Sequence, residues 1–224
     1  METQAYAVRF NAAGVYVEAD VAIPAGASGL VLFVHGSGSS RHSPRNHFVA
    51  SHLRAQGLGT VLMDLLTPAE ERADQFTGHL RFDIGFLARR VTAVLDEVRD
   101  LAPLAIGLFG ASTGAAAALV VAAAPTARIS AVVSRGGRPD LAEAALTSVK
   151  VPTLLIVGGE DREVIALNEK ARQRMKTEVL LEVVPGASHL FHEPGALETV
   201  AHLAADWFTR HLHDDRPPSV VQRR

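Results

Sequence analysis

Apolar runs with the length of a β-strand alternate with longer helical patterns along most of this chain. Six such runs cover residues 30–35, 60–66, 104–110, 129–134, 153–159 and 179–184. Most are hydrophobic at nearly every position, as expected for parallel strands that helices cover on both faces. Helical patterns occupy residues 44–56, 80–101, 113–124, 140–146, 162–175 and 194–213. This alternation predicts an α/β fold with a doubly wound, mostly parallel sheet between two layers of helices.

Two earlier segments, residues 5–10 and 15–23, alternate between apolar and polar positions and predict an antiparallel hairpin at one edge of the sheet. The expected sheet therefore has eight strands. No internal repeat and no Ser/Gly-rich linker divides the 224 residues, so residues 1–213 are expected to form a single domain. Residues 214–224 are polar and interrupted by prolines, which predicts a flexible C-terminal tail.

Composition excludes several classes of function. With 22 basic and 24 acidic residues the net charge is −2, too close to neutral to indicate a nucleic-acid partner or a membrane-surface role. The absence of cysteine excludes disulfides, a thiolate nucleophile and cysteine-ligated zinc. No apolar run approaches the roughly 18 residues of a membrane span, and the N-terminus lacks the features of a signal peptide. A cytoplasmic location is expected, and the sequence does not indicate an oligomeric state.

The segment Gly-Ala-Ser-Thr-Gly at residues 110–114 fits the G-x-S-x-G pattern of a nucleophile elbow. It lies between a predicted strand and a predicted helix, where such an elbow holds its serine in a strained turn between small residues. We therefore interpret Ser112 as a candidate nucleophile. The alternative is a glycine-containing turn in which Ser112 only caps the following helix.

A serine nucleophile needs a base and an acid that orients the base. Asp161 follows the predicted strand 153–159, and His189 follows the predicted strand 179–184, both at the sheet edge that carries Ser112. The order Ser, Asp, His is the one that this kind of fold uses. Glu160 is an alternative acid, and His192 is an alternative base. Asp161 could also serve only as the N-cap of the next helix.

An acyl-transfer site also needs donors for the developing oxyanion. The backbone N–H of Thr113 is the expected first donor, because this residue follows the nucleophile. The second is expected from the glycine-containing loop 35–40, with Ser37 as the candidate and Gly38 next. A phosphate-binding loop is the alternative for this segment, but it lacks the G-K-[ST] ending of a P-loop.

The motifs HGSGSS, GASTG, GGED and GASHLF together resemble the α/β-hydrolase superfamily over nearly the whole chain. The resemblance is to the small, lidless dienelactone-hydrolase-like branch. It implies a carboxylesterase-like enzyme that uses no cofactor and no metal. Dienelactone hydrolase itself has a cysteine nucleophile, so Ser112 implies a serine esterase-like member. Similar domains also occur fused to phosphoribosyltransferase domains, and none is expected within these residues.

The expected reaction is hydrolysis of a small-molecule carboxylic ester through an acyl-enzyme on Ser112. Acyl transfer, thioester or lactone cleavage by the same triad, and a non-catalytic hydrolase-fold binding protein remain open. Only five residues separate the strand 129–134 from the next predicted helix, so no cap domain is expected. Among the arginines near the active edge, Arg41 and Arg135 are candidates to hold an anionic substrate group; Arg45 and Arg138 lie in the same loops.

Overall fold

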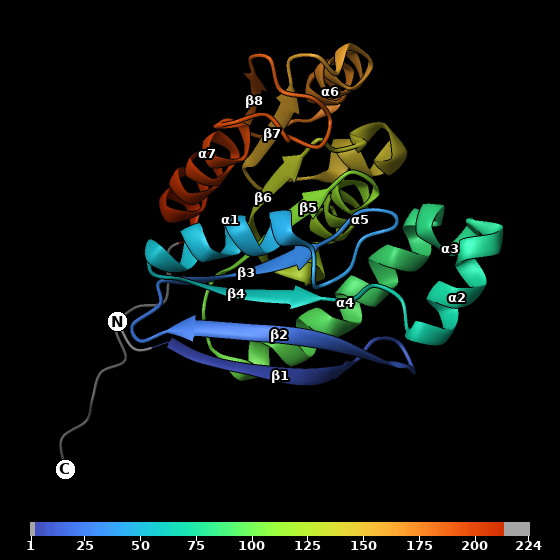
Figure 1. Ribbon diagram of the computed structural model, residues 1–224, viewed down its shortest axis with the longest axis vertical. Coiled ribbons are helices and arrows are strands. Elements are labelled where there is room, and N and C mark those ends of the chain that lie inside the picture. The colour runs from blue at the N-terminus through green and yellow to red at the C-terminus, as the bar shows by residue number, and fades with distance from the viewer. Residues whose placement is uncertain (1–2, 213–224) are drawn as a thin grey trace.

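The computed structural model describes residues 3–212, and these residues form an eight-stranded sheet with helices on both faces (Figure 1). The strands are β1 (Thr3–Asn11), β2 (Tyr16–Pro24), β3 (Gly29–Val34), β4 (Leu58–Met63), β5 (Ile106–Ala111), β6 (Ile129–Arg135), β7 (Thr153–Gly158) and β8 (Val179–Val184). Their order in the sheet is β1-β2-β4-β3-β5-β6-β7-β8. Strands β1 and β2 form the antiparallel edge, and the other six are parallel. The predicted sheet and its hairpin are confirmed.

The connections between strands are mostly helical. The helices are α1 (Pro44–Ala55), α2 (Pro68–Thr77), α3 (His79–Phe82), α4 (Ile84–Leu101), α5 (Thr113–Ala122), α6 (Arg162–Arg174) and α7 (Ala196–His211), with 3₁₀ segments η1 (Pro125–Ala127) and η2 (Pro139–Ser148). Helices α1 and α7 cover one face of the sheet, and α4 and α5 cover the other (Figure 1). This is the layer arrangement that the alternating sequence pattern predicts.

Two hydrophobic cores, one on each face, hold the layers together. On the α1/α7 face, the rings of Phe33 and Phe109 lie 4.8 Å apart and pack against Phe208 of α7. On the α4/α5 face, Val91 and Leu95 of α4 are fully buried against the sheet and α5. Helix α5 is buried nearly all round, because its alanines and glycine let it approach the sheet closely.

The segment between β4 and α4 contains two helices, α2 and α3, where the sequence analysis expected a loop and a longer helix beginning near residue 80. Gly78 adopts the left-handed conformation at φ 64° and ends α2, and Asp83 then accepts a hydrogen bond from the Phe86 N–H at the start of α4. The expected long helix is therefore interrupted by a turn. Thr67 and Glu70 form a capping box at the start of α2, and this local pattern is the sequence signal for the helix.

The connection after β6 is short. Residues 136–138 lead directly into η2, a 3₁₀ segment that is kinked at Glu143 (φ 46°) rather than the regular helix expected over 140–146. Within residues 3–212 no insertion after β6 forms a cap over the active edge. The expectation of a capless fold is confirmed.

Both ends of the described chain lie at the edge of the sheet where the parallel strands begin. Thr3 pairs with Pro24 at the end of β2, next to the start of β4. Leu212 packs at the starts of β3 and β5, where a Cβ on Gly29 would lie 2.7 Å from its Cβ. The predicted tail, residues 214–224, lies outside the described residues.

Candidate active site

The residues proposed from sequence for catalysis lie in loops at the carboxyl ends of the parallel strands. Ser112 follows β5, Asp161 follows β7 and His189 follows β8. In open α/β sheets this edge is where ligands bind. The topology therefore brings three positions that are far apart in sequence to one rim.

Ser112 lies in a sharp turn between β5 and α5. Its backbone has φ 50° and ψ −122°, a region that costs a non-glycine residue about 1–3 kcal/mol. It occupies the N-cap position of α5, but its side chain makes no capping hydrogen bond. Helix capping therefore does not explain the serine at this strained position.

The glycines on either side of this turn are required by close backbone approach. A Cβ on Gly114 would lie 2.2 Å from the Val34 carbonyl oxygen, and a Cβ on Gly110 would lie 2.4 Å from the Ala115 Cα. These distances are far below van der Waals contact. The G-x-S-x-G pattern is thus explained by packing of the turn against β3 and the start of α5.

Asp161 and His189 form a hydrogen-bonded pair between two neighbouring loops. The Nδ1 of His189 lies 2.6 Å from the Oδ2 of Asp161. Asp161 stands at the N-cap position of α6, yet its carboxylate makes no capping hydrogen bond. Neither Glu160 nor His192 takes part in this pair. Since the Asp161 carboxylate accepts at Nδ1, the neutral ring of His189 presents its Nε2 as an acceptor.

Ser112 and His189 both contact one short backbone segment, residues 135–136. The Arg135 carbonyl accepts a hydrogen bond from the Ser112 N–H at 3.3 Å. A Cβ on the next residue, Gly136, would lie 3.5 Å from the Cε1 of His189. Within the described residues no hydrogen bond joins the Ser112 hydroxyl to His189.

The two candidate oxyanion donors lie next to each other. The Ser37 N–H donates to the Oγ1 of Thr113 at 3.1 Å, and Thr113 is buried. The loop passes close to the elbow, since a Cβ on Gly36 would lie 3.0 Å from the Ser112 Cβ. The Thr113 N–H belongs to the first turn of α5, where backbone N–H groups lack helical partners. Use of the Ser37 N–H by a substrate would require a small rotation of its peptide.

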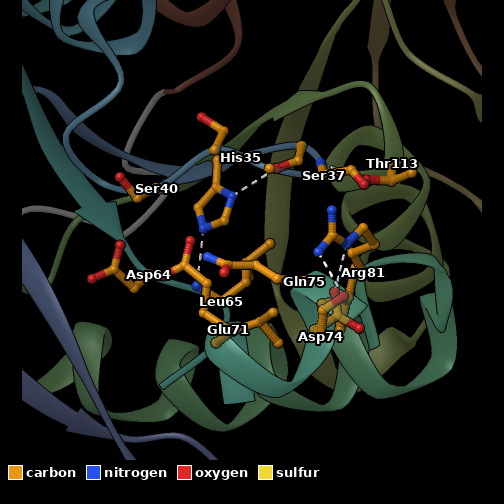
Figure 2. Close-up of a pocket in the computed structure, with 15 residues that line it drawn as sticks. His35, Ser37, Ser40, Asp64, Leu65, Glu71, Asp74, Gln75, Arg81 and Thr113 are labelled. Atoms are coloured by element: carbon orange, nitrogen blue, oxygen red, sulfur yellow. Dashed lines mark hydrogen bonds and ion pairs between the residues drawn. The ribbon is translucent and has the colours of Figure 1, made fainter. Parts of the chain in front are cut away.

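His35 is a site residue that the sequence analysis missed. Its Nε2 accepts a hydrogen bond from the Leu65 N–H at 3.0 Å, so the proton is on Nδ1, which donates to the Gly36 carbonyl at 2.9 Å (Figure 2). Burial lowers the pKa of His35 and outweighs the opposing effects of the Gly36 hydrogen bond, Asp64 and Glu71. The neutral ring therefore links loop 35–40 to the loop after β4.

A cavity of about 160 Å³ lies beside Ser37 and Thr113, on the α4 face (Figure 2). Its floor includes Leu65 and Leu87, and its outer wall comes from α2 and α3. Along that wall lies an ion pair between the buried Asp74 and the partly exposed Arg81, with the Arg81 Nε 2.6 Å from the Asp74 Oδ2. The cavity lies next to the turn at Ser112, since Thr113 is part of its lining.

The four arginines near the active edge differ in whether they form an ion pair. Arg41 forms an ion pair with Asp64, its Nη1 2.5 Å from Oδ2, and its Nε lies 3.6 Å from Asp20. Arg138 pairs with Asp140 at 2.7 Å. Within residues 3–212, Arg45 and Arg135 have no ion-pair partner, and Arg135 is buried.

Comparisons with known proteins agree with the fold described above. A sequence model of the dienelactone hydrolase family matches residues 69–213. A crystal structure of dienelactone hydrolase from Anabaena variabilis is 53% identical, covers 95% of this chain and 100% of its own, and superposes with a TM-score of 0.92. The chain belongs to the dienelactone hydrolase family.

More distant structures share only the fold of this family member. A cold-adapted esterase from an Arctic intertidal metagenomic library is 19% identical, with 94% of each chain covered and a TM-score of 0.73. The eight-stranded sheet is thus that of an α/β hydrolase, as the sequence motifs predict.

Two curated Mycobacterium tuberculosis proteins, from strains CDC 1551 and H37Rv, are 53% identical to this dienelactone hydrolase family member over 208 residues. Their names assign them, provisionally, to the phosphoribosyl transferases. The alignment covers 92% of this chain but 46% of theirs, so the chain spans about half the length of the curated relatives it matches.

One group of potential metal ligands lies near the active edge. Ligand atoms of Asp20, His42 and His47 lie within 4.8 Å of one another, with both histidines exposed. The guanidinium of Arg41 already lies against the Asp20 carboxylate, and a metal ion there would face this cation. We therefore assign no metal to the group. None of the helices in residues 3–212 combines the length and the hydrophobicity that crossing a bilayer demands.

Proposed function

We propose that this dienelactone hydrolase family member is a serine hydrolase that cleaves small carboxylic esters. Ser112 is the proposed nucleophile, His189 the base and Asp161 the acid that orients it. The observation that carries the proposal is the 2.6 Å hydrogen bond between Asp161 and His189 at the rim where Ser112 stands in its strained turn. Residues 1–213 are proposed to act as one such domain.

In the proposed reaction the Nε2 of His189 takes the proton of Ser112 as its Oγ attacks the ester carbonyl carbon. The N–H groups of Thr113 and Ser37 hold the negative oxygen of the tetrahedral intermediate. When the intermediate collapses, His189 gives its proton to the departing alkoxide. Water, deprotonated by His189, then attacks the acyl-enzyme and releases the carboxylic acid. Asp161 keeps the imidazole in the reactive tautomer and stabilises its positive charge.

Of the two arginines proposed from sequence as substrate contacts, Arg41 is engaged with Asp64, which anchors the loop preceding α1. Its proposed contribution is to hold this loop and thereby the Ser37 peptide. Arg135 has no such partner and remains the proposed contact for an anionic group. We propose a cytoplasmic location for the enzyme. The proposed chemistry needs no metal or organic cofactor.

Labelling with a fluorophosphonate probe tests the nucleophile. We expect labelling of the protein and turnover of p-nitrophenyl acetate, with both lost in Ser112→Ala. Ser51→Ala, at an exposed serine on α1, is the matched control and is expected to label like the unchanged protein. Labelling of Ser112→Ala at the original rate would refute the assignment.

The alternatives with the same triad give different results in the same experiment. Rapid labelling with turnover only when a second alcohol or amine is supplied would indicate an acyltransferase. A panel of thioesters and lactones beside the esters identifies the bond that is cleaved fastest. A protein that neither labels nor turns over any of them would be a binding protein. Phosphoribosyl transfer appears only in the names of the mycobacterial relatives, which are about twice as long as this chain, and we do not propose it here.

A further inference from the structure

Helix α6 carries an amide side chain that is completely buried. Asn168 is 0% exposed, and its Nδ2 donates to two carbonyl oxygens, that of Val164 in the same helix at 2.8 Å and that of Gly137 at 3.0 Å. Its Oδ1 is buried and has no hydrogen-bond partner within residues 3–212. A buried polar atom without a partner costs free energy, which an apolar side chain at this position would avoid. What Asn168 adds to the fold is therefore its bond to Gly137, outside its own helix.

Gly137 belongs to a short segment, residues 135–138, that contacts both Ser112 and His189. The carbonyl of its first residue accepts from the Ser112 N–H at 3.3 Å, and the N–H of its last residue donates to the Ser112 carbonyl at 3.2 Å. The residue before Gly137 faces the imidazole, since a Cβ there would lie 3.5 Å from the Cε1 of His189. A shift of the 135–138 segment therefore changes the separation of the proposed nucleophile and the proposed base.

The middle of the 135–138 segment is held by a backbone and a side-chain hydrogen bond. The Gly136 N–H donates to the Ile156 carbonyl in β7 at 2.8 Å. The Gly137 carbonyl accepts from Asn168, and in the part of the chain that the structure describes no other side chain hydrogen-bonds to the backbone of this segment. Asn168 is thus the side chain through which α6 holds the segment.

The same helix begins at the proposed acid. Asp161 occupies the N-cap position of α6, and its Oδ2 lies 2.6 Å from the Nδ1 of His189. Asn168 follows Asp161 by seven residues, which is close to two helical turns, so both side chains leave nearly the same side of the helix. One helix therefore places the acid at its start and holds the 135–138 segment two turns later.

We propose that Asn168 is a positioning residue, which through Gly137 sets the distance between the Ser112 Oγ and the His189 Nε2. The proposal rests on the proposed hydrolase function of the same site. Asn168 acts on the step in which His189 takes the proton of Ser112, and it does not touch the substrate. Without its hydrogen bond the 135–138 segment can shift, and a misplacement of about 1 Å between reacting groups can lower a rate about 100-fold.

Asn168→Leu tests the proposal, because it keeps the approximate size of the side chain and removes the donor. We expect kcat for p-nitrophenyl acetate to fall about 10–100-fold with KM nearly unchanged, and fluorophosphonate labelling of Ser112 to slow by a similar factor. All of the protein should still become labelled, because the site is displaced and not unfolded. The acidic limb of kcat/KM against pH should keep its midpoint, because the hydrogen bond between Asp161 and His189 is left intact.

Thr153→Val is the matched control, since it also removes a buried side-chain bond to a backbone carbonyl. Thr153 is 0% exposed, and its Oγ1 donates to the Val151 carbonyl at 3.1 Å, at the start of β7 and thus at the end away from Asp161. This variant should label at the unchanged rate. If Asn168 served stability alone, Asn168→Leu would show a smaller labelled fraction or an earlier urea transition, with an unchanged labelling rate and unchanged kcat per labelled site. That pattern would overturn the proposal.

Hydrogen exchange provides a measurement that does not depend on activity. In Asn168→Leu the amides of Gly136 and Arg138 should exchange about tenfold faster, the factor that corresponds to one lost hydrogen bond. In Thr153→Val their exchange should be unchanged. Unchanged exchange in Asn168→Leu would show that Asn168 does not hold the segment, and the proposal would be wrong whether or not the protein is an enzyme.

The outcomes separate the positioning role from the hydrolase proposal. If the unchanged protein neither labels nor hydrolyses any ester, the hydrolase proposal fails and the positioning role fails with it. If the unchanged protein is active and Asn168→Leu labels at the same rate, the positioning role fails alone. Should Asn168→Leu prove unfolded by circular dichroism, Asn168→Ser decides. Its hydroxyl can donate to the Val164 carbonyl one turn back but not to Gly137 as well, so the proposal requires the same slowing of labelling.

Discussion

The Nδ1 of His189 lies 2.6 Å from the Oδ2 of Asp161, and this hydrogen bond joins the loop after β8 to the loop after β7. The carboxylate is largely shielded from solvent, while the ring is 40% exposed and accessible from the rim. Such a carboxylate fixes the tautomer of the imidazole and stabilises the imidazolium that forms during acyl transfer.

Asp161→Asn is therefore expected to lower kcat for p-nitrophenyl acetate by about 10⁴-fold, because an amide favours the wrong tautomer. The fold should persist, since Asp161 makes no capping hydrogen bond to α6. Steady-state kinetics together with circular dichroism check this. The control is Glu160→Gln, the neighbouring acid, which should retain activity. A larger loss in Glu160→Gln than in Asp161→Asn would transfer the role to Glu160.

The strained backbone of Ser112 should have a measurable effect on stability. Glycine adopts φ 50° without a Cβ clash, so Ser112→Gly should be more stable than Ser112→Ala by about 1 kcal/mol in urea unfolding. The reverse order is expected at Ser51, in the middle of α1, where alanine should exceed glycine by about 1 kcal/mol. If alanine were more stabilising than glycine at Ser112 as well as at Ser51, the turn would store no strain.

Gly114 is expected to tolerate no side chain. Gly114→Ala would place a Cβ 2.2 Å from the Val34 oxygen, and the backbone movement needed should cost about 3 kcal/mol or more. At Gly186 a Cβ meets nothing within 4 Å, and only the left-handed φ of 70° opposes it, so Gly186→Ala should cost about 1–2 kcal/mol. Chemical denaturation of both variants measures the difference, and similar losses would contradict close packing at the elbow.

His35 should make the protein sensitive to mild acid. Its pKa in the folded protein is lowered by burial, so the unfolded chain binds a proton first as the pH falls below the ordinary value of 6.5. The free energy of unfolding should then decrease with falling pH by up to about 1.4 kcal/mol per pH unit from this group. In His35→Gln, whose amide oxygen can still accept from the Leu65 N–H, the slope between pH 7 and pH 5 should be smaller. Denaturant titrations at several pH values compare the slopes, and parallel curves would exclude His35 as the source.

Arg135 should be a residue whose removal stabilises the protein. Replacing a buried, unpaired cation by an apolar side chain, as in Arg135→Met, should raise the free energy of unfolding by about 1 kcal/mol or more. Arg172→Met, at an exposed position, should change it little. Thermal and urea unfolding provide the comparison. A clear loss of stability in Arg135→Met would mean that the guanidinium has a structural role inside the fold.

The sheet and its loops were predictable because the relevant signals are local. Continuous apolar runs define the parallel strands, and the alternation in the first 24 residues defines the hairpin edge. The capping box of Thr67 and Glu70 is equally local and indicates the start of α2, which the apolar pattern alone does not predict. The helix break at Asp83 is harder to predict from sequence, because the apolar periodicity of the flanking helices continues through it.

The contacts of His35 and Arg41 could not be predicted from sequence, because no motif marks their partners. His35 accepts a hydrogen bond from Leu65, 30 residues away in the sequence, and Arg41 forms an ion pair with Asp64, 23 residues away. Only folding reveals that Arg41 is neutralised whereas Arg135 is buried without a partner. Sequence patterns identify which residue types reach the rim, but charge balance there depends on three-dimensional neighbours.

Thr3 and Leu212 both lie where the parallel strands start, across the sheet from Ser112 and His189. In a longer polypeptide, of the length seen in the mycobacterial relatives, a neighbouring module joined at either point would leave from the back of this unit. Such a module would not obstruct entry of substrate at the front, so two modules could operate on one chain without competing for the same opening.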